Sequence, residues 1–263
     1  LFINQINDSS FYYDLKILKN VLICKSKVFN VPYKLTIRND RLNKILDFEL
    51  VSKKLVLKIE NETDYKNKND TGNIRISFKN KNNIFNYELT KNTLDVFLKD
   101  TNKIFESLIE FKPFYFVSNL RYQTFRINDL LDNPLFIEIL KSQIFNNKNL
   151  NAMITFEVKN IFDLDRFSDL SLILKIEEGD YDFSNSNIIW KDNVDIFFSE
   201  ASLNFDDAKM NFNGRTSFDV KDKNEFYKFF QIKKELRKNI EKIKFDFNYD
   251  FNEEKINIDN LRI

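Results

Sequence analysis

Two pairs of adjacent carboxylates are the residues whose type and spacing come nearest to catalysis. Glycoside hydrolysis uses two carboxyl groups, one as the acid and the other as the base or nucleophile. Glu177-Glu178 and Asp206-Asp207 offer such pairs. Both pairs fall between alternating runs of apolar and polar residues, where acidic side chains are ordinary solvated turn residues. The pairs therefore predict hairpin turns, and we assign no catalytic residue.

Missing residue types limit the remaining chemistry. The chain of 263 residues has no His and a single Cys, Cys24, which removes histidine bases, thiolate metal clusters and an internal disulfide. Three Gly residues leave no glycine-rich phosphate loop. Asp180 and Asp182 lack the further ligands of a calcium loop. We expect a protein that is not an enzyme and that needs no metal or cofactor.

The charge balance argues against nucleic acid as a partner. Lys+Arg is 41 and Asp+Glu is 40, so no strong net field draws the protein to a polyanion. One basic run stands out, formed by Lys233, Lys234, Arg237, Lys238 and Lys242. It could contact anionic lipid head groups, but cations at the end of a helix also complement the helix dipole. The second interpretation is the one we favour from sequence.

The elements that must position these residues are strands. Ile74, Ile76 and Phe78 alternate with polar residues, which places apolar and polar side chains on opposite faces of a strand. The same alternation recurs over 31–38, 85–90, 150–159, 170–176, 216–220 and 243–249. One-sided strands of this kind are typical of antiparallel sheets. Tight turns are predicted at Glu178-Gly179-Asp180 and at Asn213-Gly214.

Two segments have helical periodicity instead. Asn133-Pro134 offers an N-cap followed by proline at the first helical position. Asp222 and Glu225 form a capping box and predict a second amphipathic helix near residues 223–241. Each helix follows a series of strands, which indicates two related β-groove segments, 1–147 and 148–263.

The predicted fold is mainly β: an elongated, curved antiparallel sheet, or β-trough, with two amphipathic helices. The candidate strands outnumber the roughly ten that a strongly twisted open sheet holds without curling or splitting. The alternation also continues at Ile256 and Ile258, close to the last residue. A sandwich or a closed barrel remains the alternative, because a second layer or a filled interior would also bury the apolar rows.

Residues 149–263 contain segments that resemble a known family. They include the Glu178-Gly179 turn, Trp190-Lys191-Asp192, the Asn213-Gly214 turn and the Phe226-Tyr227 helix. With the preceding strand from Asn149 to Val158, they resemble the C-terminal β-rich region of AsmA-like proteins, the bacterial envelope family of AsmA, TamB and YhdP. That family is similar to the bridge-like lipid transfer proteins.

The resemblance implies a periplasmic protein, anchored in the inner membrane, whose apolar groove holds or conducts phospholipid acyl chains for outer-membrane lipid homeostasis. The longest apolar stretch, 111–117, contains Lys112 and Pro113 and is far shorter than the roughly 18 residues of a membrane-spanning helix. We therefore expect the anchor to lie outside this segment, in a longer protein. An outer-membrane or envelope protein is a further expected partner.

The groove lining is predicted from the apolar rows of the second half. It comprises Ile154, Phe156, Val158, Leu172, Leu174, Ile176, Phe218, Val220, Phe245, Phe247 and Tyr249. The alternative function is a structural or protein-binding β-sandwich domain of the cell envelope, in which the same side chains would form a filled core.

Overall fold

The computed structural model describes residues 4–28, 31–66, 69–78, 81–128, 149–162, 164–191, 193–206 and 209–263. This part of the chain is mainly β, as predicted. It divides into two compact units. Unit 1 comprises Leu1–Lys99 and Glu106–Pro113, and unit 2 comprises Asp100–Phe105 and Phe114–Ile263. Strand β9 (Lys103–Phe111) contributes residues to both units.

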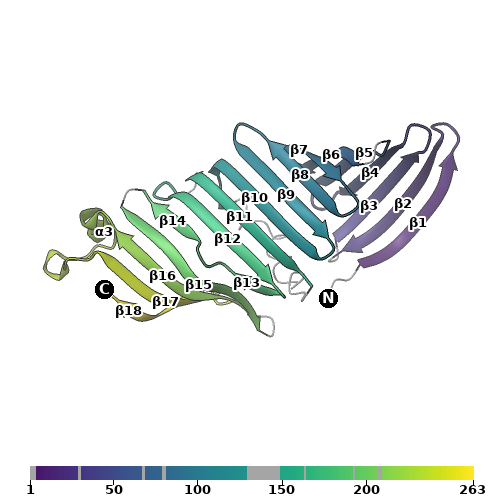
Figure 1. Cartoon of the computed structure of the whole chain (residues 1–263). Helices are drawn as coiled ribbons and strands as arrows, with labels where there is room; N and C mark the ends of the chain where they lie inside the picture. Colours follow the sequence, from purple (N-terminus) through teal and green to yellow (C-terminus); the bar gives the residue numbers. More distant parts are fainter. Residues whose placement is uncertain are drawn as a thin grey trace. The chain divides into compact units, whose positions relative to one another are not determined.

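Unit 1 is an antiparallel meander (Figure 1). Its strands are β1 (Asn4–Asp14), β2 (Lys19–Val28), β3 (Val31–Asp40), β4 (Ile45–Ser52), β5 (Leu57–Asp64), β6 (Asp70–Phe78), β7 (Lys81–Leu89) and β8 (Thr93–Lys99). Each strand from β1 to β7 pairs antiparallel with the next strand in the chain. Such pairing follows from the predicted short turns between one-sided strands.

The turns of unit 1 use acidic residues and left-handed backbone. Asp14 and Asp40 each end a strand, and their carboxylates accept hydrogen bonds from the backbone N–H of Lys16 and Asn43, both at 2.9 Å. Lys44, which precedes β4, has a φ of 54°. Side chains that accept bonds from the next turn residues are a common reason for Asp at such positions.

Unit 2 contains β10 (Phe114–Phe125) and the strands that the family resemblance covers. The latter are β11 (Asn151–Ile161), β12 (Ser168–Glu177), β13 (Asp180–Asp182), β14 (Asn187–Trp190), β15 (Val194–Asp206), β16 (Lys209–Val220), β17 (Lys242–Asp250) and β18 (Lys255–Arg262). The short strands β13 and β14 both lie between β12 and β15. From β15 to β18, each strand pairs antiparallel with the next.

One pairing in unit 2 departs from the predicted antiparallel pattern. Strands β10 and β11 run parallel, with Phe116 opposite Ala152 and Tyr122 opposite Val158. A parallel pair needs a crossover of about a dozen residues or more, and the connection 126–150 is long enough to supply one. The alternation of side chains does not reveal strand direction, so the sequence analysis had no signal for this pair.

Of the two turns predicted at glycine residues, the structure contains one. The Glu178-Gly179 turn is confirmed, since both residues have positive φ, 52° and 92°, between β12 and β13. The Asn213-Gly214 turn is wrong, because both residues lie inside β16, where Gly214 is opposite Phe247. Gly214 is needed there for space: a Cβ would stand 2.6 Å from Cα of Ala201.

Helix α3 (Lys223–Phe229) begins where the capping box predicted. The Asp222 carboxylate accepts hydrogen bonds from the backbone N–H of Asn224 (2.9 Å) and Glu225 (3.1 Å). The predicted extent, 223–241, is wrong. Gln231 has a φ of 52°, which breaks the helix, and only a short 3-10 turn, η1 (Lys234–Leu236), follows.

The other predicted helix, which begins at Asn133-Pro134, falls within 129–148, a range that lies outside the described residues. The two-helix part of the predicted fold is therefore unconfirmed. Across the described ranges, no helix combines the length and apolarity needed to cross a bilayer.

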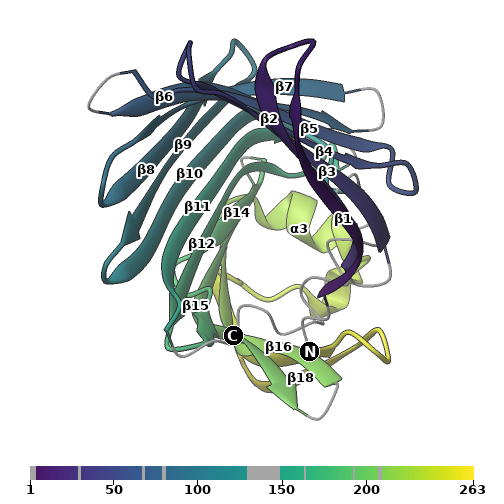
Figure 2. The same ribbon diagram turned by 90° about the vertical axis from the view of Figure 1, so that its right-hand side faces the viewer.

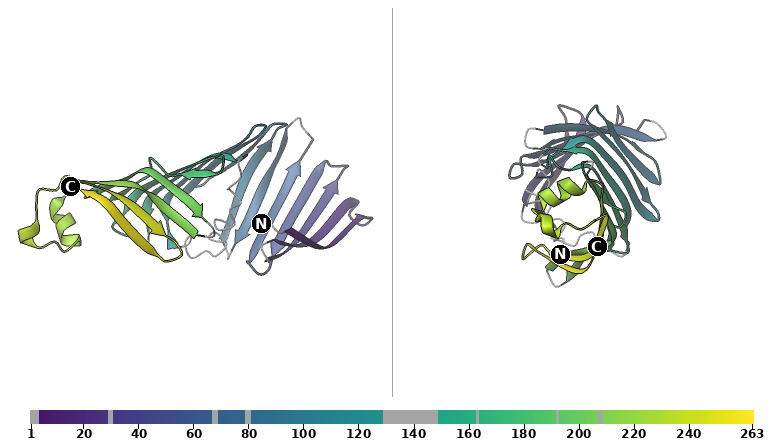
Figure 3. Two further views of the ribbon diagram at one scale, coloured as in Figure 1. Left: turned by 90° about the horizontal axis from the view of Figure 1, so that it is seen from below. Right: turned by 90° about the vertical axis from the view of Figure 1, so that its left-hand side faces the viewer.

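The sheet of unit 2 is curved, and α3 lies within the arc of its strands (Figure 2; Figure 3, right). Three apolar clusters occupy this side of the sheet. The first surrounds Trp190 and Val194 and includes Phe226 and Tyr227 of α3. The second is centred on Met210 and the third on Val158. The core of unit 2 thus lies on the concave face.

Candidate apolar binding face

The predicted lining residues of β11 and β12 share one face of unit 2. Ile154 lies opposite Leu174, and Phe156 lies opposite Leu172. Ile176, at the end of the same row, lies opposite Ala152. Directly opposite residues on neighbouring strands point to the same side of the sheet. The register of β11 and β12 therefore puts these five side chains on one face of the sheet.

A second group comes from β16 and β17. Phe245 lies opposite Thr216, Phe247 opposite Gly214, and Tyr249 opposite Phe212. Phe218 lies on the same face as these residues because it is two positions from Thr216. The rings of Phe218 and Phe245 are 5.4 Å apart, centre to centre, and those of Phe212 and Phe247 are 5.2 Å apart. The ring contacts therefore form two groups on this face, one at Phe245 and one at Phe247.

Burial separates the eleven predicted residues into two sets. Val158, Ile176, Val220 and Phe247 are buried, with 2%, 3%, 7% and 7% of their surface exposed. The other seven are half-buried: Ile154, Phe156, Leu172, Leu174, Phe218, Phe245 and Tyr249. The half-buried set still presents apolar surface that further apolar groups could cover.

Part of this surface is already covered by α3. Val220 is in the Trp190 cluster, and Phe218 and Phe245 pack against it. Phe226 and Tyr227 of α3 belong to the same cluster and are 4% and 5% exposed. At this end of unit 2, a second layer therefore packs on the predicted lining.

Unit 1 has an apolar face that the sequence analysis did not assign as a site. Ile37 of β3 lies opposite Leu22 of β2 on one side and Phe48 of β4 on the other. The full row crosses the strands through Phe11, Leu22, Ile37, Phe48, Asn61, Ile74 and Phe85. A parallel row contains Cys24, Leu35, Leu50, Ile59 and Ile76. We call these two rows the unit 1 apolar face.

The unit 1 apolar face is more open than that of unit 2. Leu22, Ile37, Phe48 and Ile74 are all half-buried, and Phe11 on the edge strand is 71% exposed. All three clusters of buried apolar residues found in the described ranges lie in unit 2. The rows of unit 1 therefore bury less of their apolar surface than the rows of unit 2.

A small polar network lies in the middle of this face. Asn61 donates a hydrogen bond to the Tyr87 hydroxyl at 2.9 Å, and the hydroxyls of Thr63 and Tyr87 are in close contact. Tyr87 lies over Gly72, where a Cβ would stand 2.5 Å from its hydroxyl oxygen. These polar atoms satisfy one another, so the network adds little polarity to the face.

The opposite face of unit 1 is charged. Lys58 lies between Glu60 and Glu49, with Nζ to oxygen distances of 2.7 Å and 3.4 Å. The hydrogen bond with Glu60 raises the pKa of the Lys58 amino group. Ion pairs at such exposure contribute little to stability, but they keep this face solvated. The sheet of unit 1 therefore has one mainly apolar side and one mainly charged side, on which Val21 and Val51 lie among the charged side chains.

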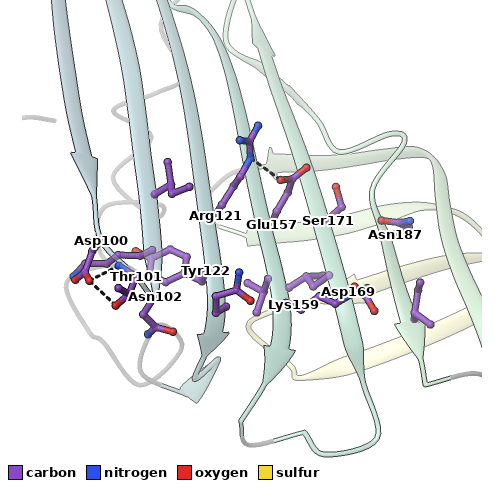
Figure 4. A pocket seen from close by; sticks show the side chains of 16 residues that line it. Asp100, Thr101, Asn102, Arg121, Tyr122, Glu157, Lys159, Asp169, Ser171 and Asn187 are labelled. Carbon is purple, nitrogen blue, oxygen red and sulfur yellow. Dashed lines mark hydrogen bonds and ion pairs between the residues drawn. The ribbon is translucent and has the colours of Figure 1, made fainter.

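A pocket of about 420 Å³, lined by both polar and apolar side chains, lies in unit 2 across β10, β11 and β12 (Figure 4). Four of its charged side chains form two ion pairs: Arg121 Nε is 2.9 Å from Glu157, and Lys159 contacts Asp169. Mutual neutralisation leaves these groups poorly suited to bind a charged ligand.

The predicted acidic pairs lie at strand ends. Glu177 accepts a hydrogen bond from Lys175 at 2.8 Å, and Glu178 is an exposed turn residue. Asp206 ends β15, whereas Asp207 lies outside the described residues. In the described parts of the chain, no three potential metal ligands gather in one place.

Comparison with known proteins identifies no related protein. No family model, curated protein or solved structure matches this chain. The similarity to AsmA-like proteins therefore stays a prediction, and the function must be argued from the apolar faces themselves.

The sequence carried part of the signal for the unit 1 apolar face. Alternation along 31–38 and 74–78 was visible in the residues. The register that aligns Leu22, Ile37 and Phe48 across three strands depends on turn geometry, and single-strand patterns do not contain it.

Proposed function

We propose that this chain holds the acyl chains of phospholipids on its apolar sheet faces. The observation that carries the proposal is the unit 1 apolar face, whose rows cross the strands while their side chains stay half-buried. A single-layer sheet of this kind exposes apolar surface unless another apolar body covers it. Contiguous exposed apolar surface of this sort marks a binding site in soluble proteins.

An acyl chain suits this face in shape and chemistry. Each buried methylene contributes about 0.8 kcal/mol, so a chain lying across several strands gains several kcal/mol without any polar contact. The rows consist mainly of Leu, Ile and Phe, which offer no directional bonds and can accept a chain in many positions. Head groups would remain in water beside the sheet.

The AsmA-like resemblance over residues 149–263 supports the setting of this activity. Following it, we place the chain in the periplasm, as part of a protein anchored in the inner membrane outside this segment, with a role in outer-membrane lipid homeostasis. An envelope protein partner belongs to the same proposal. The half-buried lining of unit 2, for example Phe156 and Leu174, would continue to offer apolar contacts there.

A second candidate function is a structural or protein-binding β-domain. The observation that favours it is the cluster in which α3 packs on Val220, Phe218 and Phe245 of unit 2. A filled core of this type needs no ligand. The two functions differ in what they predict for unit 1, where the apolar face is more exposed.

The test compares two neighbouring positions of β6 that face opposite sides. Ile74 is in the apolar row, whereas Asn73 is exposed on the other face. The wild-type protein, Ile74→Asp and Asn73→Asp are purified in mild detergent, and phospholipid in organic extracts is quantified by mass spectrometry. We expect lipid with the wild type and with Asn73→Asp. For Ile74→Asp we expect a loss of about tenfold or more, since a buried carboxylate costs several kcal/mol.

Circular dichroism separates loss of binding from loss of folding, because both variants should keep the strand spectrum of the wild type. Lipid-free wild-type protein under gentle extraction would refute the proposal and favour the structural β-domain. Equal lipid retention by Ile74→Asp and Asn73→Asp would show that the unit 1 apolar face is not the binding surface.

A further inference from the structure

The segment after α3 concentrates positive charge. Residues Lys228–Lys238, which we call the basic arm, contain five cations: Lys228, Lys233, Lys234, Arg237 and Lys238. Glu235 is their single acidic residue, although the chain as a whole has a net charge of only +1. This imbalance is local and requires a local reason.

The helix dipole does not explain the basic arm. Helix α3 ends at Phe229, so only Lys228 lies in its last turn, where it also pairs with Glu225 at 3.3 Å. The dipole effect fades within one turn of the helix end. Lys233, Lys234 and Lys238 come after that turn and form no ion pair with any carboxylate of the described residues.

Exposed apolar side chains are interleaved with these cations. Phe229, Phe230 and Leu236 are 40%, 49% and 64% exposed, and all residues from Lys233 to Asn239 are exposed. Phe229 and Phe230 each pack one side of the ring on Trp190, while the rest of each ring, and most of Leu236, faces solvent. Basic residues mixed with exposed aromatic and aliphatic residues are the composition of interfacial membrane segments.

Two neighbouring loops add cations to the same place. The Arg166 guanidinium lies over the Phe229 ring at 4.9 Å, and Lys191 follows Trp190 at the β14–β15 turn. With Lys228 they line a cavity of about 580 Å³ beside the exposed ring of Phe229. Neither Arg166 nor Lys191 has a carboxylate partner within the described ranges.

We propose that the basic arm, together with Arg166 and Lys191, docks unit 2 on the surface of an anionic phospholipid bilayer. The cations would contact lipid phosphates, and Phe229, Phe230 and Leu236 would enter the head-group region. Charge complementarity selects this partner over a neutral surface. The exposed Leu and Phe side chains favour a bilayer over nucleic acid, which binds such side chains only through base stacking.

This inference is independent of the acyl-chain proposal. Docking needs only the basic arm and its neighbours, whereas lipid holding needs the apolar face of unit 1. A protein that binds vesicles but carries no lipid would support docking alone. Lipid carriage without vesicle binding would support only the acyl-chain proposal.

The experiment measures flotation of the full chain with two kinds of vesicle, phosphatidylcholine alone and phosphatidylcholine containing phosphatidylglycerol. The test variant combines Lys233→Gln, Lys234→Gln and Lys238→Gln. The matched control combines Lys53→Gln, Lys54→Gln and Lys91→Gln, which changes the net charge equally at exposed lysines of unit 1. Leu236→Ser tests the apolar contribution without altering charge.

We expect the wild type to bind the anionic vesicles preferentially, and more weakly as salt rises. Each lysine near the surface should contribute about a fivefold gain in affinity, so the test variant should lose on the order of 100-fold. The control should bind like the wild type, and Leu236→Ser should lose several-fold. Equal losses in test and control variants, equal binding to both vesicles, or binding of a DNA duplex without binding of anionic vesicles would each overturn the proposal.

Discussion

The hydroxyl of Tyr181 makes the stability of unit 2 sensitive to alkaline pH. Tyr181 is 3% exposed in the Met210 cluster, and its hydroxyl has no hydrogen-bond partner among the described residues. Burial raises the pKa of Tyr181 from 10.0 to about 12. The unfolded chain therefore loses this proton near pH 10, whereas the folded protein keeps it until about pH 12.

The sign and size of the effect follow from this difference. Between pH 10 and 12 the folded state binds more protons than the unfolded state, so the free energy of unfolding falls as pH rises. One pKa unit corresponds to about 1.4 kcal/mol, which gives a loss of up to about 3 kcal/mol over the window. Below pH 10 this contribution is fully retained.

The substitution Tyr181→Phe isolates the effect. At pH 8 it removes an unpaired buried hydroxyl, so we expect equal or greater stability, by about 1 kcal/mol. Above pH 10 the variant does not lose this stability, because it has no hydroxyl to deprotonate at position 181. The difference in the free energy of unfolding between the variant and the wild type should therefore grow by about 1 to 3 kcal/mol. Urea unfolding at pH 8, 10 and 11, followed by circular dichroism and by the fluorescence of Trp190, measures both quantities.

Two comparisons make the test specific. Burial also raises the pKa of Tyr33 and Tyr122, but both residues are present in the wild type and the variant, so their effects cancel in the difference. Tyr13→Phe removes an exposed hydroxyl and should leave stability at pH 8 within about 0.5 kcal/mol. Parallel stability curves for wild type and Tyr181→Phe from pH 8 to 11 would refute the reasoning.

Three further substitutions test the packing of unit 2 by urea unfolding. Gly214→Ala should lower the free energy of unfolding by about 1 to 3 kcal/mol, because the added Cβ meets Ala201. Lys209→Ala on the same strand is the control and should change the free energy of unfolding little. Equal stability of Gly214→Ala and the wild type would contradict the close approach between Gly214 and Ala201. Asp222→Ala should cost about 1 kcal/mol through loss of the N-cap, and Asp222→Asn should restore most of it. Phe226→Ala should cost about 3 to 5 kcal/mol, and clearly more than truncation of the half-exposed Phe229, if α3 seals the Trp190 cluster.

Local sequence patterns predicted most of the strands and the start of the helix. Alternation over 74–78 and 243–249 predicted strands that the structure contains, and the Asp222 capping box predicted the first residue of α3. The end of α3 had no such signal, because the left-handed residue that stops it is Gln231 and not glycine. Periodicity at Leu236 and Ile240 continued past that point and gave too long a helix.

Non-local features were harder to predict. Gly214 looked like a turn residue because a turn and a close approach between strands both require glycine. The parallel pairing of β10 with β11 is a matter of strand direction, which the composition of either strand does not encode. For the candidate site, alternation identified which residues share a face within one strand. The half-buried state of Ile37 and Phe48 depends on what covers the sheet, which strand patterns do not encode.

The meander of unit 1 also determines which changes of length the protein can accept. Each strand there pairs with its neighbours in the chain, so adding or removing a whole hairpin would keep strand direction and both surfaces intact. Removing one residue within β4 would instead turn the following side chains over and place charged groups among Leu35 and Ile59. Related genes should therefore differ by units of two strands, and small insertions should gather in the turns.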